Sequence, residues 1–364
     1  MQKIKRFFIF LLIACMLFGC VSCGYPTRAP DLSAEDRELI DTQSDDRIPY
    51  SDAPGYDLWD HWGTGTSQEE NEIYVNAMYQ SGDFLVSAYK EGICINRYLG
   101  SSKMVEIPET IDNKPVIKLG TYPVWNEHYH SYSFYGLFNE KEIKTVQFPS
   151  SLKEIIADTL NNVQDAVVVS EDNPYYTSEN GMLYNKTKDY LLFVPENAAD
   201  STFAVPENVV RITDDVLTCE AIDTLVLHEK IEQIHSDYAR DIASSNHLQC
   251  FEVDANNPYY ASEDGVLYNK DKTKLLRYPC GKEDEMFVVP KSVKSFETYA
   301  FNYIQYLKVV VIGKNVEEAV SAFTIPDEIE TKPYAIVGYK GTEAENVAMH
   351  YDYAFIPLDL ASEW

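Results

Sequence analysis

The sequence predicts a repeat solenoid that is rich in β-strand, with short helical turns and β-hairpin insertions. Three observations support this fold class. Segments 173–212 and 257–296 align without a gap and share 20 of 40 residues. A shorter apolar pattern recurs at spacings of 22 and 23 residues. The composition, 45% hydrophobic and 24% charged over 364 residues, is that of a chain with enough apolar surface to build a core.

The N-terminus has the features of an export signal. Lys3, Lys5 and Arg6 precede an unbroken apolar run over residues 7–18. Twelve helical residues reach about 18 Å, well short of the roughly 30 Å hydrocarbon core of a bilayer. We therefore expect a signal peptide over residues 1–19 rather than a membrane span.

The residues that end this run, Leu17-Phe18-Gly19-Cys20, resemble the lipobox of bacterial lipoproteins. The resemblance implies that Cys20 is diacylated on sulfur and becomes the first residue of the mature chain. It also implies an extracytoplasmic protein, held at the cell membrane or cell surface by its lipid. Cys23 is an alternative acceptor, and an ordinary secretory signal cleaved near the same place is the alternative to lipidation.

Residues 20–72 read as an acidic, flexible tether, because from residue 24 they are rich in Asp, Glu, Ser, Thr, Pro and Gly and have no sustained apolar period. The one apolar island, 56–62, either docks on the folded part or meets a partner. Five cysteines remain beyond the signal and Cys20, and the sequence leaves open whether any of them form a disulfide: Cys23, Cys94, Cys219, Cys250 and Cys280. Their spacing favours buried free thiols.

The duplicated segments share the motif Asn-Pro-Tyr-Tyr, followed by Gly-x-Leu-Tyr-Asn-Lys. Each copy predicts two short strands joined by a polar turn, hence β-hairpins at 181–195 and 265–279. The acidic runs 170–173 and 254–257, just before the motif's Pro, lack the ligand spacing of a calcium loop and predict solvated turns.

A smaller unit, apolar-x-apolar-Pro-x-x-apolar-x-x-apolar, predicts one strand, a corner at Pro and further apolar residues pointing into the same core. One such coil cannot bury its own apolar face, so neighbouring coils must stack. The copies with Pro begin at Val146, Phe203 and Phe287, and those without it begin at Leu225 and Val310. His228 takes the Pro position of its copy, and we expect it to be a corner residue.

These repeats resemble the BspA-like class of leucine-rich repeat proteins over about residues 73–357. Segment 105–116 is similar to the opening turn of that class, and segment 336–345 with Phe355 to its terminal cap. The resemblance implies a right-handed leucine-rich-repeat superhelix with opening strands at 73–123, repeats at 124–330 and a C-terminal cap at 331–364. It also implies a non-catalytic binding or adhesion module for a protein or glycan.

The segment 121–138 departs from this pattern, because nine aromatic or His residues are concentrated in a stretch where a plain repeat is expected. We expect Tyr122, Trp125, Tyr129 and Tyr132 to form part of a ligand-binding surface. The alternative is that the same rings cap the first coil.

The formal charge of −28 makes nucleic acid an improbable partner. No GxSxG, HExxH, P-loop or GxGxxG motif is present, so we expect neither an enzyme nor a cofactor. His128 and His130 would share a strand face, but they lack a third convergent ligand, so no metal is expected. An envelope-associated hydrolase with its site in 121–138 remains the alternative function.

The last expectation concerns the outward positions of the repeat strands. These are uncharged and mostly small or aliphatic, which suggests a face partly covered by neighbours or by a partner: Gln147, Ala204, Val226, Val288 and Val311. The acidic charge must then lie mainly in the tether and the turns.

Overall fold

The computed structural model describes residues 78–120, 122–126, 131–138, 141–156, 159–235, 247–301, 304–323 and 335–358. The predicted signal, the tether and Cys20 lie outside these ranges. Over the described ranges, no helix has both the length and the apolar character needed to cross a bilayer.

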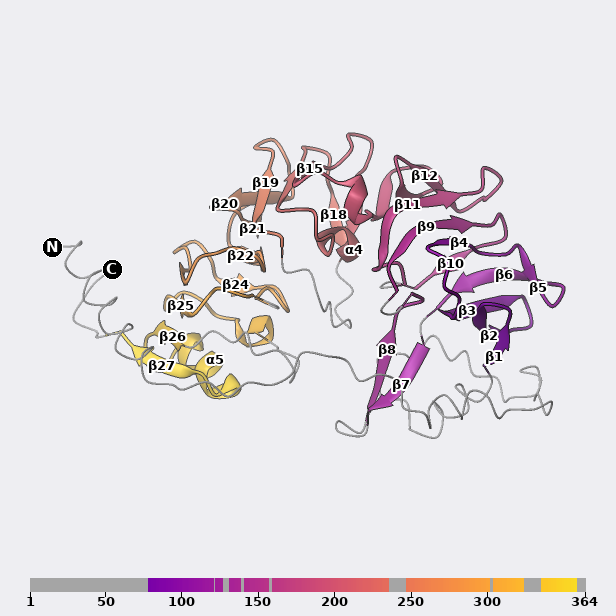
Figure 1. Cartoon of the computed structure of the whole chain (residues 1–364). Coiled ribbons are helices and arrows are strands. Elements are labelled where there is room, and N and C mark those ends of the chain that lie inside the picture. The colour runs from indigo at the N-terminus through magenta and orange to yellow at the C-terminus, as the bar shows by residue number, and fades with distance from the viewer. Residues whose placement is uncertain are drawn as a thin grey trace. The chain divides into compact units, whose positions relative to one another are not determined.

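The described chain is a β-solenoid in which each turn contributes a strand to sheet layer 1, where all pairing is parallel (Figure 1). The layer consists of three consecutive sheets. The first contains β4 (Met104–Glu106), β9 (Ile143–Phe148) and β11 (Val163–Val169). The second contains β15 (Thr202–Ala204), β17 (Thr224–Leu227) and β19 (Cys250–Val253). The third contains β23 (Met286–Val288), β25 (Val309–Val311), β26 (Ala335–Gly338) and β27 (Ala354–Pro357).

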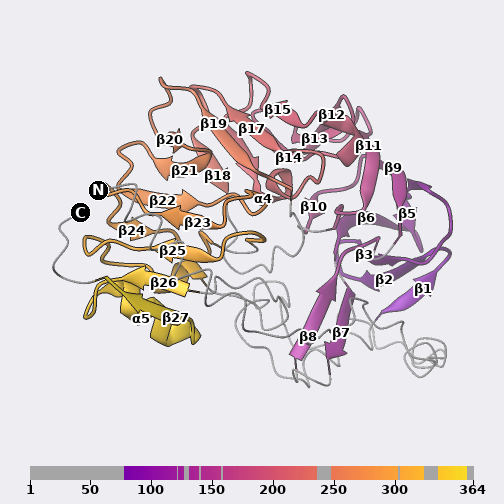
Figure 2. The same ribbon diagram turned by 60° about the vertical axis from the view of Figure 1, so that its left-hand side comes forward.

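Sheet layer 2 forms the other wall of the turns and also consists of three sheets (Figure 2). The first contains β1 (Tyr79–Ser81), β2 (Phe84–Ala88), β3 (Ile93–Tyr98), β5 (Thr110–Ile111), β6 (Lys114–Leu119) and β10 (Glu154–Ile155). The second contains β12 (Tyr176–Glu179), β13 (Met182–Asn185), β14 (Tyr190–Phe193), β16 (Arg211–Thr213) and β18 (Gln233–His235). The third contains β20 (Tyr260–Glu263), β21 (Val266–Asn269), β22 (Lys274–Arg277) and β24 (Ser295–Phe296).

The small apolar unit identified in the sequence builds both walls of each turn. In the turn of β15, the alternating pair Phe203 and Val205 is buried from layer 1, and Val209 and Ile212 are buried from the corner and layer 2. The strand ends before Pro206, which has no N–H to continue the ladder. The second short strand, here β16, is a feature that the sequence pattern did not predict.

His228 occupies its corner as predicted. Its Nδ1 accepts a hydrogen bond from the Lys230 N–H at 3.2 Å, so its Nε2 carries the proton and donates to the Pro206 carbonyl of the preceding corner at 3.1 Å. The imidazole thereby links two successive corners in place of a proline.

Both predicted hairpins are present, and each has a third strand before it, β12 or β20. The middle strands β13 and β21 are buried on both faces. Leu183 belongs to the core cluster on one side of β13, and Met182 and Tyr184 belong to the next cluster. In β21, Leu267 and Tyr268 divide in the same way. The hairpins are therefore internal partitions between successive core clusters rather than surface decorations.

A buried asparagine fixes each partition to the preceding corner. Asn173 is 0% exposed, and its Nδ2 donates to the carbonyls of Pro149 and Leu152, both at 2.9 Å. Its Oδ1 accepts the N–H groups of Tyr175 and Tyr176 at 2.8 Å. Asn257, also 0% exposed, makes the equivalent four bonds. The predicted solvated turns are therefore wrong at these two positions, because the amide side chain satisfies backbone groups inside the fold.

The C-terminal turns contain the 3₁₀-helix η4 (Val320–Phe323) and the helix α5 (Glu343–Tyr351), which packs against β26. Two shorter helical turns, η3 (Glu196–Ala198) and α4 (Asp214–Leu217), lie earlier in the chain. Rings from successive turns stack through this part of the core. Tyr278 and Phe301 have centroids 5.5 Å apart, and Phe301 and Phe323 lie parallel at 4.6 Å.

Candidate binding surface

The aromatic segment forms a separate two-stranded sheet of β7 (Tyr122–Asn126) and β8 (Ser131–Tyr135). Figures 1 and 2 show this hairpin extending away from the stacked turns. The backbone register pairs Trp125 with Tyr132, and Tyr122 with Tyr135. Tyr129 lies outside the described residues, as do His128 and His130. Three of the four predicted site residues therefore belong to one hairpin that departs from the repeat.

The outward positions of sheet layer 1 form a row that crosses successive turns in register. Gln147 pairs with Val168, Ala204 with Val226, and Val288 with Val311. We call these six residues the uncharged row. Glu106 and Glu252 extend it at one end of the first and second sheets. The parallel ladders hold these side chains at the regular strand spacing of about 4.8 Å within each sheet.

The uncharged row is largely open. Val168 is 44% exposed and Val288 is 54% exposed, and Gln147 and Ala204 are also exposed. Val226 and Val311 are half-buried, so the coverage by neighbours expected from the sequence is partial. Val337, which follows Val311 in register, is buried. The row is therefore an accessible, mostly apolar strip on a strongly acidic protein.

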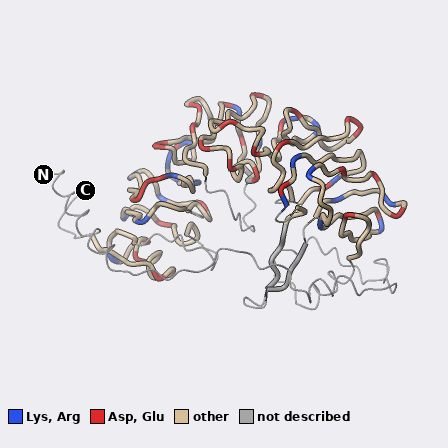
Figure 3. Tube along the Cα trace, in the orientation of Figure 1, with Lys and Arg blue, Asp and Glu red and all other residues tan. Residues whose placement is uncertain are grey.

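Most acidic residues lie away from this strip, although Glu106 and Glu252 continue it in register. Figure 3 shows the acidic residues of the described chain concentrated along the turns that join the strands. Most ion pairs there are exposed, such as Lys272 with Glu263 at 2.7 Å and Lys188 with Glu179 at 3.2 Å, and they contribute little stability each. The charge pattern predicted for the turns is confirmed for the described residues.

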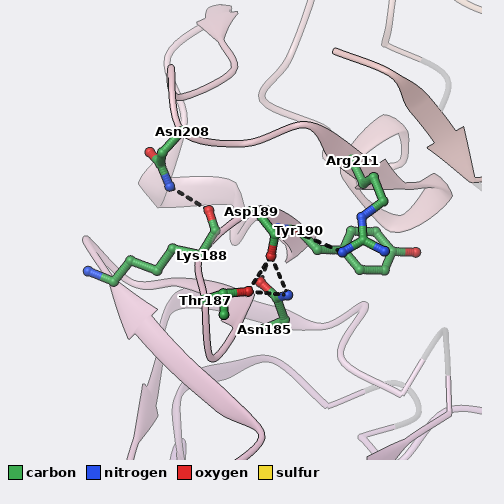
Figure 4. A network of polar contacts seen from close by, with 7 residues as sticks. All are labelled: Asn185, Thr187, Lys188, Asp189, Tyr190, Asn208 and Arg211. Atoms are coloured by element: carbon green, nitrogen blue, oxygen red, sulfur yellow. Dashed lines mark hydrogen bonds and ion pairs between the residues drawn. The ribbon is translucent and has the colours of Figure 1, made fainter. Parts of the chain in front are cut away.

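The most connected polar cluster belongs to the first hairpin (Figure 4). Asp189 accepts hydrogen bonds from Thr187 and from Asn185, the latter at 2.6 Å, and Arg211 binds its other oxygen at 3.0 Å. The Thr187 and Asn185 hydrogen bonds lower the pKa of Asp189 to about 2. The Arg211 guanidinium also lies over the Tyr190 ring, 4.9 Å from its centroid.

This cluster is best explained as a set of side-chain bonds that stabilise the turn of the first hairpin. In the second copy, Thr273 takes the place of Asp189 and accepts the Asn269 amide at 2.9 Å, and Ser295 takes the place of Arg211. The hairpin therefore closes with or without the charged pair, and every donor facing Asp189 already has its acceptor.

The described thiols are unsuited to nucleophilic chemistry. Cys94, Cys219 and Cys250 are free. Burial raises the pKa of Cys94 well above its usual range and the pKa of Cys219 to about 11, which keeps both protonated at neutral pH. Across the described ranges, no group of three His, Cys, Asp or Glu side chains is arranged to hold a metal ion.

Tyr175 and Tyr259 are two exposed rings that are not among the four site residues expected from the sequence. They are 46% and 50% exposed, at equivalent positions in the two hairpins. In both copies the next residue is a second tyrosine, Tyr176 or Tyr260, whose hydroxyl bonds a backbone carbonyl. The sequence signal for the exposed rings is therefore their position as the first tyrosine of the Tyr-Tyr pair.

No protein-family model matches the sequence, and no curated protein matches it. Similar solved structures include a leucine rich cell surface protein from Faecalibacterium prausnitzii, with 19% identity over 66% of this chain and 72% of that chain and a TM-score of 0.32. The pneumococcal vaccine antigen PcpA gives 19% identity, 71% and 72% coverage, and a TM-score of 0.35. A leucine-rich repeat protein from Eubacterium ventriosum gives 18% identity over 72% of this chain and 71% of that chain, with a TM-score of 0.35. At these identities and TM-scores, the fold assignment rests on the strand pairing described above.

Proposed function

We propose that this chain is a non-catalytic binding or adhesion module that presents a repeat surface to a protein or glycan outside the cell. The observation that supports this most directly is the uncharged row. In a chain of net charge −28, an accessible apolar strip that crosses successive turns costs solubility, and such strips are typical of interaction sites. Solenoids bind through extended faces of this kind because every turn adds one position to the same strip.

The row also sets the chemistry of the partner. The six residues of the row carry no charge, and the acidic turns beside it repel phosphate backbones and anionic headgroups. A protein or glycan surface with an apolar or neutral polar face fits both conditions. Nucleic acid does not fit them.

The test is a binding screen of the full-length chain, purified in detergent, against surface proteins and glycans. Val288→Glu places a charge in the row at a 54% exposed position, where the fold tolerates it. We expect this variant to weaken binding of a captured partner about tenfold, or about 1.4 kcal/mol, without a change in melting temperature. Equal binding by the variant and the wild type would remove the row from the proposal.

We also propose that Cys20 is lipidated and tethers the module to the membrane through residues 20–72. The sequence Leu17-Phe18-Gly19-Cys20 supports this. Labelling with a fatty-acid analogue in a bacterial host should mark the wild type and not Cys20→Ser. Label retained by Cys20→Ser would move the assignment to Cys23 or remove it.

Tyr122, Trp125, Tyr129 and Tyr132 remain a second proposed contact region, supported by their density in the one segment that departs from the repeat. Trp125→Ala combined with Tyr129→Ala should weaken partner binding about tenfold or more at unchanged melting temperature. A large fall in melting temperature would show that the segment is a cap. Cleavage of a captured glycan or protein would instead favour the hydrolase alternative.

A further inference from the structure

Tyr175 and Tyr259 differ from the other tyrosines that the two hairpins share. Tyr184 and Tyr268 are 2% and 1% exposed within the core, and the hydroxyls of Tyr176 and Tyr260 bond backbone carbonyls. The rings of Tyr175 and Tyr259 are about half exposed and have no hydrogen bond or ring contact with any described residue. Both copies thus keep a half-exposed tyrosine whose hydroxyl and ring make none of the bonds that hold the other shared tyrosines.

The backbone beneath each exposed ring is firmly held. The Tyr175 N–H donates to the buried Asn173 Oδ1 at 2.8 Å, and its carbonyl accepts the Lys186 N–H at 2.8 Å. Tyr259 is held in the same way by Asn257 and Lys270, again at 2.8 Å. A ring presented on a fixed backbone loses little conformational entropy when a ligand covers it.

The lysine whose backbone N–H bonds each of these tyrosines also has its ammonium anchored to the backbone. Lys186 Nζ donates to the Glu171 carbonyl at 3.0 Å, and Lys270 Nζ donates to the Ala255 carbonyl at 2.8 Å. The acceptor is a backbone oxygen in both copies, so the lysine makes the same hydrogen bond although residue 171 is Glu and the equivalent residue 255 is Ala. An ammonium has three N–H donors, and one such bond leaves two of them for a ligand.

We propose that Tyr175 with Lys186, and Tyr259 with Lys270, are two equivalent subsites for a neutral, hydroxyl-rich polysaccharide. The proposal rests on the binding function proposed above and names a ligand class and a second contact site for it. The apolar C–H face of a sugar ring can cover the exposed aromatic ring, and sugar hydroxyl oxygens can accept from the ammonium. The acidic turns around both subsites disfavour a polyanionic chain.

The arrangement of the two subsites favours a chain-like ligand. One hairpin follows β11 and the other follows β19, with the turns of β15 and β17 between them. A polymer of repeating sugars can occupy both subsites at once, and the second contact then forms at a high effective concentration. A single sugar can occupy only one.

Affinity electrophoresis of the full-length chain in detergent tests the proposal, with barley β-glucan, galactomannan, xylan and the anionic polygalacturonate as probes in the gel. We expect at least one neutral polysaccharide to retard the wild type, and no retardation by polygalacturonate. Tyr175→Ala and Tyr259→Ala should each raise the apparent Kd about tenfold, and the double variant should migrate as it does without polysaccharide. The matched control is Tyr306→Ala, which removes a 44% exposed ring elsewhere and should bind as the wild type.

Absence of retardation by all three neutral polysaccharides would overturn the proposal, as would retention of binding by the double variant. Loss of binding to a protein partner, rather than to a polysaccharide, in the double variant would overturn the glycan assignment. If Val288→Glu weakens partner binding while the tyrosine variants do not, these subsites fail and the proposed function stands. All variants should melt within about 1 °C of the wild type, because surface changes away from bonded groups usually cost less than about 0.5 kcal/mol.

Discussion

The buried asparagines allow the hairpin partitions to be tested by one substitution, Asn257→Ala. The side chain is 0% exposed and makes four hydrogen bonds, two as donor and two as acceptor, at 2.8–3.0 Å. Alanine leaves the Ile231 carbonyl and the N–H groups of Tyr259 and Tyr260 without these partners. The His228 carbonyl keeps a weaker bond from the Ile231 N–H at 3.3 Å.

Three unsatisfied backbone groups at about 1–2 kcal/mol each predict a loss of about 3–6 kcal/mol in the free energy of unfolding. The matched control is Asn256→Ala, an exposed neighbour of the same residue type, which should cost less than about 0.5 kcal/mol. Asn257→Asp keeps the acceptor but points a carboxylate at two carbonyls, so it should be at least as destabilising as alanine.

The assay is urea denaturation of each variant, followed by circular dichroism, together with hydrogen exchange of the β21 amides. Turns of a solenoid contact only their neighbours, so the loss should appear first as faster exchange in β20 and β21. An Asn257→Ala midpoint equal to that of Asn256→Ala, with unchanged exchange, would show that these four hydrogen bonds do not hold the hairpin in place.

Three further predictions concern the core and its charges. Leu225 is 1% exposed, so Leu225→Asp should lower the free energy of unfolding by more than about 4 kcal/mol. Ala204→Asp, on the outward side of the neighbouring strand, should leave the urea midpoint nearly unchanged. Similar midpoints for the two variants would contradict the assigned core face. Tyr278→Phe removes a buried hydroxyl that has no hydrogen-bond partner among the described residues, so it should be neutral or raise stability by up to about 1 kcal/mol, and a loss above 1 kcal/mol in the same assay would reveal a missing partner. Hydrogen bonds from its neighbours lower the pKa of Asp189 to about 2, so its contribution to the free energy of unfolding is complete above its unfolded pKa of about 3.9 and is lost as pH falls through about 2. Asp189→Asn should therefore reduce the drop in urea midpoint between pH 4.5 and pH 2. An equal drop in the variant and the wild type would count against a stabilising role for these hydrogen bonds.

The turns of the solenoid could be predicted from the sequence because their pattern is local. Phe203, Val205, Val209 and Ile212 recur with fixed spacing, and each is buried as the spacing requires. The two hairpins could be predicted because 20 of 40 residues repeat. Residues such as Pro206, which cannot extend a ladder, mark the corners without reference to the rest of the fold.

The role of the hairpins could not be predicted in the same way. That β13 is buried on both faces depends on turns before and after it, which the motif itself does not specify. Asn173 looked like part of a polar turn, and only the position of the preceding corner shows that its amide satisfies buried carbonyls. The uncharged row was visible as a set of residues, but its exposure depends on which neighbouring segments cover the sheet.

The candidate site shows the same division. Trp125 and Tyr132 were selected for their density in the sequence, and the register pairs them across one hairpin. Tyr175 and Tyr259 belong to the duplicated motif, so the sequence gives no sign of a role beyond the repeat. Their exposure becomes apparent only when the adjacent Tyr176 and Tyr260 are found bonded to the backbone.

The most direct test of the central claim is a glutamate scan along the uncharged row, measuring the Kd of one captured partner for each variant. We expect Glu at neighbouring exposed positions of the row to raise the Kd about tenfold, with the melting temperature unchanged. The positions to be substituted are Gln147, Val168, Ala204 and Val288. Substitution of the exposed turn residue Glu207 by Gln should have no effect. A flat profile, in which no row position changes the Kd, would contradict the claim that this face of the solenoid is the binding surface.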